Sequence, residues 1–298
     1  MRPALISGVT MLLTAVCAAP AVAAPVPLPE ALESVTAACA STSSALTSVG
    51  GRAVDGDSSV AVTGDRFAVS GHGTNRVAIA GEGTFGAVAD DGLRPKDRRA
   101  ALRYIKRPGA TWWLNPGAFW SPAAGWSATF DDAARAAVPL SATCAQDLAA
   151  ADSVDRDGSR WVFTLPGEGP FVVVTDGQGR VTRFGAIAIT YGAQSITAPA
   201  GAVSFAAWQK ASQAASLNST MKQISRAVAA SVNASGPNVA AIDAATRAAV
   251  PTDRVVALKV RQLRRGVLIY GRNPYTKTYH AWRIYVKGGE AVARRVAP

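Results

Sequence analysis

Two short segments contain residues that could support hydrolysis. Gly71-His72-Gly73-Thr74 could present a histidine as a general base, and Gly56-Asp57-Ser58 could present a serine nucleophile. A serine nucleophile in such a turn relies on backbone N–H groups for the oxyanion, and a glycine would have to follow it, where Ser59 stands. A histidine base needs a carboxylate that orients it and a nucleophile that it activates. The sequence has neither an acid at a strand end ahead of His72 nor a Gly-Thr-Ser turn after it. We therefore expect that both segments are turns and that the protein is not an enzyme.

The remaining polar residues form no pattern for catalysis or for a metal. The acid pairs at 90–91 and 131–132 stand at turn signals, where carboxylates usually cap helices or face solvent. His72 and His280 are the only histidines, which with so few cysteines makes a metal site improbable. The sequence contains no Walker loop, dinucleotide fingerprint, Gly-x-Ser-x-Gly elbow or His-Glu-x-x-His motif. We expect no cofactor and no metal.

The N-terminus has the order of parts of a secretory signal peptide. Arg2 supplies the charged start, residues 4–16 form a short apolar run, and Ala21-Val22-Ala23 places small residues ahead of a cleavage site. The run is shorter than the about 20 residues that cross a bilayer as a helix. Cys17 follows a bulky valine, which suits a lipid-modification site poorly. We expect a secreted chain without a lipid anchor.

The mature chain keeps two cysteines, Cys39 and Cys144. Two thiols in an oxidising compartment most often form a disulfide, and two buried free thiols are the alternative. A disulfide would close a loop of roughly 100 residues, for which chain entropy predicts about 4–5 kcal/mol of stabilisation.

Most of the positive charge lies at the C-terminal end. Residues 254–298 contain 11 basic residues and one acid, which gives 11 − 1 = +10 of the total of +11. Strand alternation would place tyrosines at 279 and 285 beside basic side chains on an exposed face. A basic face with tyrosines can bind a polyanion by charge and stacking, or it can be an ordinary solvated face. The basic residues expected to bind are Lys259, Arg261, Lys277, Arg283 and Lys287.

Because we expect export, the partner of this basic face should be an anionic membrane surface or a cell-wall polymer. A nucleic acid is not expected outside the cytoplasm.

Aromatic side chains gather in one short segment. Trp112, Trp113, Phe119, Trp120 and Trp126 fall within fifteen residues. Adjacent tryptophans on a strand point to opposite faces, so Trp112 and Trp113 cannot share one environment. The cluster predicts either plain core packing or an apolar ligand site, because such side chains bury large apolar areas.

Apolar spacing and turn residues predict an α+β fold with mostly antiparallel strands. A helix is expected over 28–46, and a second from residue 131 or 132 to about Ala150, with Cys144 on it. Asp176-Gly177-Gln178-Gly179 is a hairpin signal. Strands are expected at 59–63, 66–70, 76–80, 84–88, 101–106, 111–115, 118–121, 160–165, 171–175, 180–184 and 186–191.

Beyond residue 200 the pattern predicts a helical connector and a small α+β module. A helix is expected over 200–232 with an interruption near Asn218, and a second, capped by Asn238, to about Ala249. Four strands are expected at 255–263, 267–270, 278–287 and 291–296. The predicted divisions are a signal peptide at 1–23, a domain at 24–200, a helical connector at 201–235 and a basic module at 236–298.

The order of the elements expected over residues 28–200 resembles that of a known superfamily. A first helix precedes a run of short strands. A strand that contains a tyrosine is followed by a Pro-Gly turn and by tryptophans. A second helix then precedes a further run of strands. The segments that carry this order are 62–67, 102–106, 112–113, 161–165, 172–176, 180–181, 187–191 and 197–199. In these parts the region resembles the LolA-like superfamily of outer-membrane lipoprotein carriers and the secreted lipoglycan carriers of the LppX and LprG type.

The resemblance implies a curved antiparallel sheet, or half-barrel, that holds an apolar cavity under a helical lid, with Cys39 and Cys144 joining two lid helices. The basic module is extra to the family pattern. We therefore predict a non-enzymatic secreted carrier of a hydrophobic, lipid-like ligand. The alternative is an envelope protein that binds anionic polymers or lipid headgroups through the basic module. The residues expected to line the apolar site are Tyr104, Trp112, Trp113, Phe119, Trp120, Trp126 and Phe163.

Overall fold

The computed structural model describes residues 23–71, 73–116 and 144–297. The signal segment up to residue 22, the strand expected at 118–121 and most of the helix expected from residue 131 lie outside these ranges. So do His72 and the aromatic residues Phe119, Trp120 and Trp126. The chain divides into two compact units, the first made of Met1–Ser44 and Pro139–Ile189, the second of Ala45–Val138 and Thr190–Pro298.

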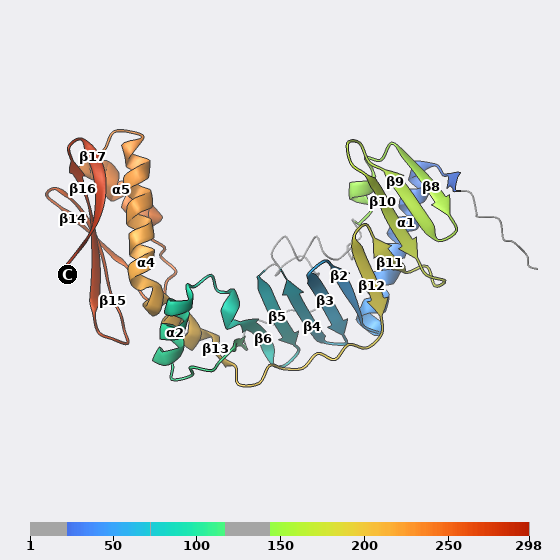
Figure 1. The fold of residues 1–298 in the computed structure, drawn as a ribbon, viewed down its shortest axis with the longest axis horizontal. Helices are drawn as coiled ribbons and strands as arrows, with labels where there is room; N and C mark the ends of the chain where they lie inside the picture. Colours follow the sequence, from blue (N-terminus) through green and yellow to red (C-terminus); the bar gives the residue numbers. More distant parts are fainter. Residues whose placement is uncertain (1–22, 72, 117–143, 298) are drawn as a thin grey trace, which may run out of the picture. The chain divides into compact units, whose positions relative to one another are not determined.

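The first unit is an antiparallel sheet with one long helix (Figure 1). Its strands are hydrogen-bonded in the order β1, β8, β9, β10, β11, β12, so from β8 onward each strand pairs with the next in the chain. Its elements are β1 (Ala24–Pro25), α1 (Leu28–Ser48), the 3₁₀ turn η3 (Gln146–Leu148), β8 (Ser153–Asp157), β9 (Arg160–Thr164), β10 (Pro170–Thr175), β11 (Val181–Phe184) and β12 (Ile187–Tyr191). The strands expected at 160–165, 171–175, 180–184 and 186–191 are confirmed within a residue or two at each end.

The hairpin between β10 and β11 forms where the turn residues predict it. The Asp176 side chain accepts hydrogen bonds from the backbone N–H groups of Gln178 and Arg180 at 2.9 and 3.0 Å. Its other carboxylate oxygen binds the Arg180 guanidinium at 2.7 Å. Gly179 has φ +73°, a conformation that glycine adopts without a steric cost.

Helix α1 is fixed to the sheet of the first unit by Thr42, which is fully buried. The Thr42 hydroxyl donates to the Ala38 carbonyl at 2.8 Å and accepts from the backbone N–H of Val181 at 2.7 Å. The N–H at the start of β11 thus has a partner, as a buried donor requires. The other buried residues of α1 in this unit follow helical spacing: Ala31, Val35, Ala38 and Cys39.

A disulfide joins Cys39 on α1 to Cys144, with the sulfurs 2.02 Å apart, so the expected pairing is confirmed. The expected helix through Cys144 to Ala150 is wrong over its described end. Residues 144–150 form turns around η3, with i→i+3 bonds such as that from the Leu148 N–H to the Ala145 carbonyl. The chain has to turn here because it passes from the disulfide into β8 within a few residues.

The second unit contains the C-terminal module and, before it, seven strands in the order β2, β3, β4, β5, β6, β7, β13. These seven are antiparallel except β13, which runs parallel to β7. Val60, Val62, Phe67, Val69 and Ala78 alternate along β3 to β5 and form one buried apolar cluster. β2 was not expected, because its sequence has a single large apolar residue. The bounds are β2 (Gly51–Asp55), β3 (Ser58–Thr63), β4 (Arg66–Gly71), β5 (Thr74–Ile79), β6 (Gly83–Ala87), β7 (Trp112–Asn115) and β13 (Val203–Ser204).

The strand expected at 101–106 is wrong, because these residues belong to helix α2 (Pro95–Tyr104) and its C-cap. Pro95 opens the helix at a position where its missing N–H costs nothing. Asp97 in the first turn pairs with Arg94 at 2.7 Å. Ala101 and Leu102 are buried in a cluster with Trp208, so the alternation that suggested a strand is one face of a helix.

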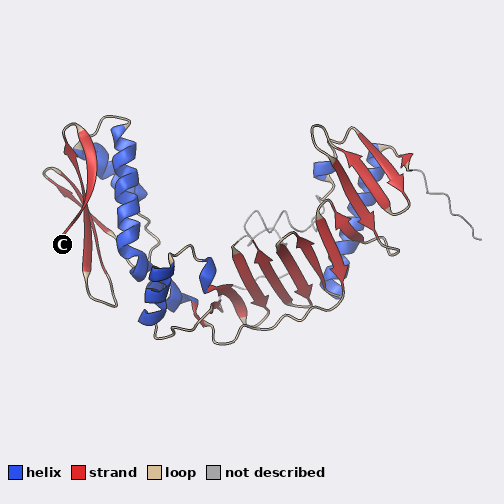
Figure 2. Cartoon of the chain, viewed as in Figure 1, coloured by secondary structure: helices blue, strands red, loops and turns tan. Residues whose placement is uncertain are grey.

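The C-terminal module is a four-stranded antiparallel sheet with two helices on one face (Figure 2). The Asn238 cap is confirmed, since its side chain accepts from the Ala241 N–H at 2.9 Å. The first strand begins later than expected, because the Val256 N–H binds the Gln213 side chain of α4 instead of a strand. The elements are α4 (Phe205–Asn233), α5 (Val239–Ala249), β14 (Lys259–Leu263), β15 (Gly266–Arg272), β16 (Tyr279–Lys287) and β17 (Glu290–Val296).

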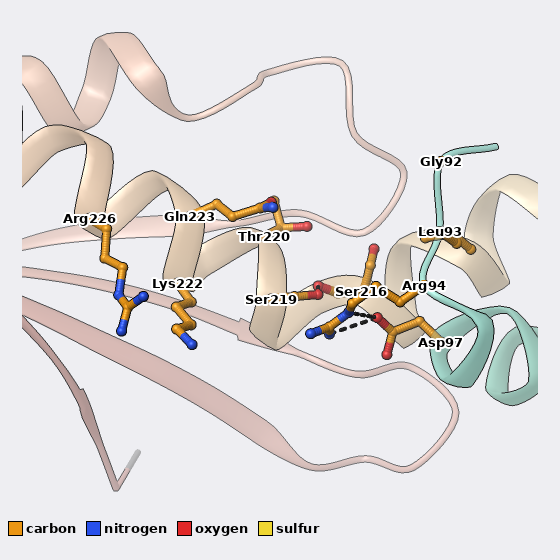
Figure 3. A pocket seen from close by; sticks show the side chains of 10 residues that line it. All are labelled: Gly92, Leu93, Arg94, Asp97, Ser216, Ser219, Thr220, Lys222, Gln223 and Arg226. Carbon is orange, nitrogen blue, oxygen red and sulfur yellow. Dashed lines mark hydrogen bonds and ion pairs between the residues drawn. The ribbon is translucent and has the colours of Figure 1, made fainter.

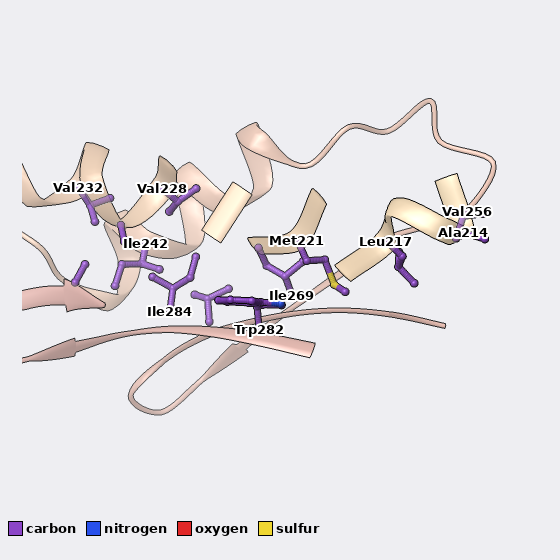
Figure 4. Packing of buried hydrophobic residues seen from close by; sticks show 13 residues of the cluster. Ala214, Leu217, Met221, Val228, Val232, Ile242, Val256, Ile269, Trp282 and Ile284 are labelled. Atoms are coloured by element: carbon purple, nitrogen blue, oxygen red, sulfur yellow. The ribbon is translucent and has the colours of Figure 1, made fainter. Parts of the chain in front are cut away.

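The core of this module lies between the sheet and α4 and α5. Figure 4 shows Ile269, Trp282 and Ile284 of the sheet packed beside Met221 of α4 and Ile242 of α5. The interruption expected in α4 near Asn218 is wrong. The Asn218 side chain accepts a hydrogen bond from the Trp282 indole at 3.1 Å, which gives an amide in a helix interior a buried partner.

The described fold is therefore α+β, with a large antiparallel β-structure that is not closed into a barrel within the described residues, and a small C-terminal sheet. Among the described helices, none has a stretch both long and apolar enough to cross a membrane.

Candidate functional site

The sheet of the C-terminal module has one face turned away from its helices. Ile269, Trp282 and Ile284 point into the core, so their strand neighbours point to the opposite side. That opposite side carries six cations and three tyrosines, and we call it the basic face. It consists of Lys259 and Arg261 on β14, Tyr270 and Arg272 on β15, Tyr279, Arg283, Tyr285 and Lys287 on β16, and Arg294 on β17.

The register brings three arginines of the basic face into one row. Arg261 lies opposite Leu268, Leu268 opposite Arg283, and Arg283 opposite Arg294. Neighbouring strands lie about 4.8 Å apart, so these guanidinium groups project within reach of one anionic chain. Like charges so close repel one another, and an anion bound across the row relieves that repulsion.

Arg283, at the centre of the row, is held in place. Its guanidinium lies 5.1 Å from the centre of the Tyr285 ring, and Nη2 donates to the Arg265 carbonyl at 3.2 Å. Its Nε is buried without a hydrogen-bond partner among the described residues. Glu290, the one acid of the C-terminal end, faces Lys287 at the far end of the sheet. The centre of the basic face therefore keeps its positive charge.

A pocket of about 340 Å³ opens at the β14 side of the basic face, and we call it the C-terminal pocket. Three cations line it, and no carboxylate stands among its lining residues. Tyr270 and Tyr279 contribute rings, and the Arg272 guanidinium lies 5.6 Å from the centre of the Tyr279 ring. Its lining residues are Lys210, Val255, Val256, Ala257, Lys259, Tyr270, Gly271, Arg272, Pro274 and Tyr279.

The structure places four of the five predicted polyanion residues, Lys259, Arg261, Arg283 and Lys287, on the basic face. Lys277 instead lies in the turn between β15 and β16 with φ 60°. Its ammonium donates to the Pro274 carbonyl at 2.8 Å.

Sequence reasoning missed three cations of this region, Arg272, Arg294 and Lys210. The first two would have been found by extending the alternation of β15 to Arg272 and by applying it to β17. Lys210 belongs to α4 and reaches the C-terminal pocket only through tertiary packing, which strand alternation cannot reveal.

The predicted apolar-site residues are not gathered into one cavity. Tyr104 stacks on Tyr275, and Trp113 packs against Phe205 with ring centres 4.7 Å apart. Trp112 lines a separate groove of about 410 Å³ with a mixed lining that includes Ser59, Ser70 and Arg76. Phe163 belongs to the other unit and is fully buried in its sheet. The described members therefore occupy several separate environments.

The first unit has its own, more apolar pocket of about 390 Å³. Phe171 and Phe184 meet there edge to face with ring centres 4.8 Å apart. Leu148 from η3 and Leu165 after β9 complete an apolar wall, and Glu168 is the charged residue in the lining. Sequence reasoning did not select these residues, because each is an ordinary strand or loop hydrophobe.

A fourth pocket, of about 360 Å³, lies between α2 and the middle of α4 (Figure 3). Lys222 and Arg226 stand one turn apart on α4, and the Arg94–Asp97 ion pair lies at the other end. The hydroxyls of Ser216 and Ser219 donate to carbonyls of their own helix. These two hydroxyls therefore have no proton left for a ligand. The Asp97 carboxylate also lines this pocket, so it suits an anion less well than the C-terminal pocket, whose lining has no carboxylate.

His280 lies on the core side of the C-terminal sheet. Burial lowers the pKa of its imidazole, and the positive charge of Arg295 lowers it further. Nδ1 is buried without a partner among the described residues. His280 is therefore a neutral structural residue near neutral pH and not part of the basic face.

Searches of family models, curated proteins and solved structures found no significant match to this chain.

Proposed function

We propose that this chain is an exported binding protein that holds an anionic polymer or anionic headgroups of the cell envelope on the basic face of its C-terminal sheet. The observation that carries the proposal is the row of Arg261, Arg283 and Arg294, on a face that no described element of the module covers. Export is supported by the N-terminal signal pattern and by the Cys39–Cys144 disulfide.

Polyanion binding is the chemistry that this face supports best. Each cation near an anionic surface contributes about 1 kcal/mol, and the six cations are spread over four strands. Arginine forms paired hydrogen bonds with phosphate and carboxylate groups. Tyr270 and Tyr285 add flat surfaces against which sugar or headgroup atoms can pack.

The proposal is tested by measuring the affinity of the protein for polyphosphate and for phosphatidylglycerol vesicles. The double variant R261E/R294E removes two cations of the central row and introduces two acids, while leaving Arg283 and its contacts in place. We expect roughly a tenfold or greater loss of affinity for both probes, since tenfold corresponds to about 1.4 kcal/mol. Added salt should weaken the wild-type complex steeply.

The matched control is R99E/R103E, which makes the same change in net charge on exposed residues of α2. If both double variants lose affinity equally, total charge and not the basic face determines binding. If the wild-type protein binds neither probe at low salt, the proposed function is wrong.

A second candidate function is the carriage of an apolar ligand, as the resemblance to the LolA-like superfamily implies. The pocket of the first unit supports it, because Phe171, Phe184, Leu148 and Leu165 form an apolar wall. The half-barrel and the helical lid that the resemblance implies are part of this second proposal. The residues concerned differ from the predicted set, since none of Tyr104, Trp112, Trp113 and Phe163 lines that pocket.

A solvatochromic dye or a fluorescent fatty acid tests the carrier hypothesis. Phe184→Ser should abolish uptake if the pocket of the first unit is the site, whereas Trp112→Ala should leave it unchanged. Uptake that is lost only in Trp112→Ala would move the site to the second unit. No uptake by the wild-type protein would end the carrier hypothesis.

A further inference from the structure

Two large apolar side chains at the rim of the C-terminal pocket are unusually exposed. Val255 and Tyr279 are 52% and 50% exposed, and with Val49 they are the three most exposed large hydrophobic residues in the described part of the chain. A single exposed hydrophobe is normal, but two in one pocket need a reason.

The exposure of Val255 is fixed by its neighbours. The N–H of Val256, the next residue, donates to the Gln213 side chain at 2.9 Å, and the Val256 side chain is buried. Arg254, on the other side, donates to the Gln213 carbonyl at 3.4 Å. The segment is thus anchored to α4 on both sides of Val255, and Val255 cannot turn inward without losing these bonds.

Cations surround the two hydrophobes. Lys210, Lys259 and Arg272 line the same pocket. Lysine and arginine carry long apolar stems, which let their charged ends reach anionic groups while the stems lie along hydrocarbon. Tyrosine is enriched at the membrane interface for a related reason, since one end is apolar and the other polar.

We infer that the C-terminal pocket is the contact with an anionic lipid bilayer. Lys210, Lys259 and Arg272 bind headgroup phosphates, while Val255 and the Tyr279 ring enter the region between headgroups and acyl chains. This inference rests on the proposed function and narrows its partner from polyanions in general to a lipid surface. A soluble polymer would satisfy the cations but would leave Val255 and Tyr279 in water, whereas a bilayer covers both.

The experiment measures binding to three probes: phosphatidylcholine vesicles, mixed phosphatidylcholine–phosphatidylglycerol vesicles, and polyphosphate in solution. The variant V255S/Y279S keeps every cation and removes the apolar rim. We expect roughly a tenfold loss of affinity for the mixed vesicles, because burying part of two such side chains corresponds to at least about 1.4 kcal/mol. Affinity for polyphosphate should fall much less, because the variant keeps every cation.

Two control variants separate the apolar contact from other effects. Val49→Ser removes an equally exposed valine outside the pocket, 52% exposed like Val255, and should bind as the wild type does. Tyr279→Phe keeps the ring beside Arg272 and should retain most of the vesicle binding.

The outcomes also separate this inference from the proposed function. If V255S/Y279S binds mixed vesicles as tightly as the wild type, the lipid inference is overturned, while polyphosphate binding that R261E/R294E weakens would leave the proposed function intact. If the wild type binds neither mixed vesicles nor polyphosphate, both fail. If V255S/Y279S loses affinity for polyphosphate and vesicles alike, the rim does not act on lipid specifically and the inference is again overturned.

Discussion

The rings of Tyr104 and Tyr275 lie face to face, with their centres 4.8 Å apart and their planes 4° from parallel. Tyr104 ends α2, and Tyr275 lies in the turn between β15 and β16. Asn273, 3% exposed, donates to the Tyr104 hydroxyl at 3.2 Å and to the Ala214 carbonyl at 3.0 Å. The pair thus joins α2 to the C-terminal module within the second unit.

This stack should contribute measurably to stability. In a double-mutant cycle with Tyr104→Leu and Tyr275→Leu, we expect a coupling of about 0.5–1.5 kcal/mol between the two rings, the range found for aromatic pairs. Urea unfolding of the four proteins measures it. Additive single effects would show that the rings merely pack independently.

Gly86 leaves room for the indole of Trp113. A Cβ added at Gly86 would overlap the indole ring, which also lies 5.0 Å from the Arg76 guanidinium. We expect Gly86→Ala to lower the free energy of unfolding by about 1–3 kcal/mol, as overpacking does. Gly109→Ala is the control, since no atom lies within 4 Å of an added Cβ there, and it should shift the thermal midpoint little. Equal effects of the two substitutions would contradict this explanation.

The disulfide should be a main source of stability for the first unit. We expect Cys39→Ala/Cys144→Ala to lose about 2–5 kcal/mol, because the bond closes a long loop in the unfolded chain. Reduction of the wild-type protein should lower its denaturant midpoint to a similar extent, while the variant should not respond to reductant. A variant as stable as the oxidised wild type would show that the cross-link adds nothing.

His280 predicts a dependence of stability on pH. Its pKa is lowered in the folded protein, so the unfolded chain binds a proton more readily than the folded chain does. Stability should therefore fall as pH drops through about 6.5, the ordinary value for histidine, toward the lowered folded pKa. The part of this slope that His280 causes should be missing in His280→Gln, measured by chemical unfolding between neutral and mildly acidic pH. Parallel curves for the two proteins would refute the assignment.

The sequence predicted most strands of both units, because alternation and glycine turns are local signals, but it missed β2 and β8 and predicted a strand at 101–106 that is not there. Asp176 and Asn238 were recognised for the same reason, since each one binds backbone N–H groups a few residues away. Helix α2 was missed because its apolar residues are few and its face becomes visible only against Trp208. Asn218 was taken for a break because its partner, Trp282, lies 64 residues further along the chain.

Four of the five cations predicted to bind a polyanion lie on the basic face, because strand alternation is a strictly local rule. The apolar site was predicted less well. Its residues were grouped by aromatic clustering in the sequence and by a family pattern, and the structure places Tyr104, Trp113 and Phe163 in separate environments. The rim formed by Val255 and Tyr279 depends on Gln213 of α4 holding residues 254–256, a contact that no local pattern contains.

The first unit is discontinuous, and its disulfide joins residues 105 positions apart on either side of a long excursion into the second unit. During synthesis Cys39 is made well before Cys144, so its thiol has to wait for its partner. No other cysteine stands between the two in the sequence. The bond can form only after residues 40–143 have been made, so the covalent closure of the first unit comes late in synthesis.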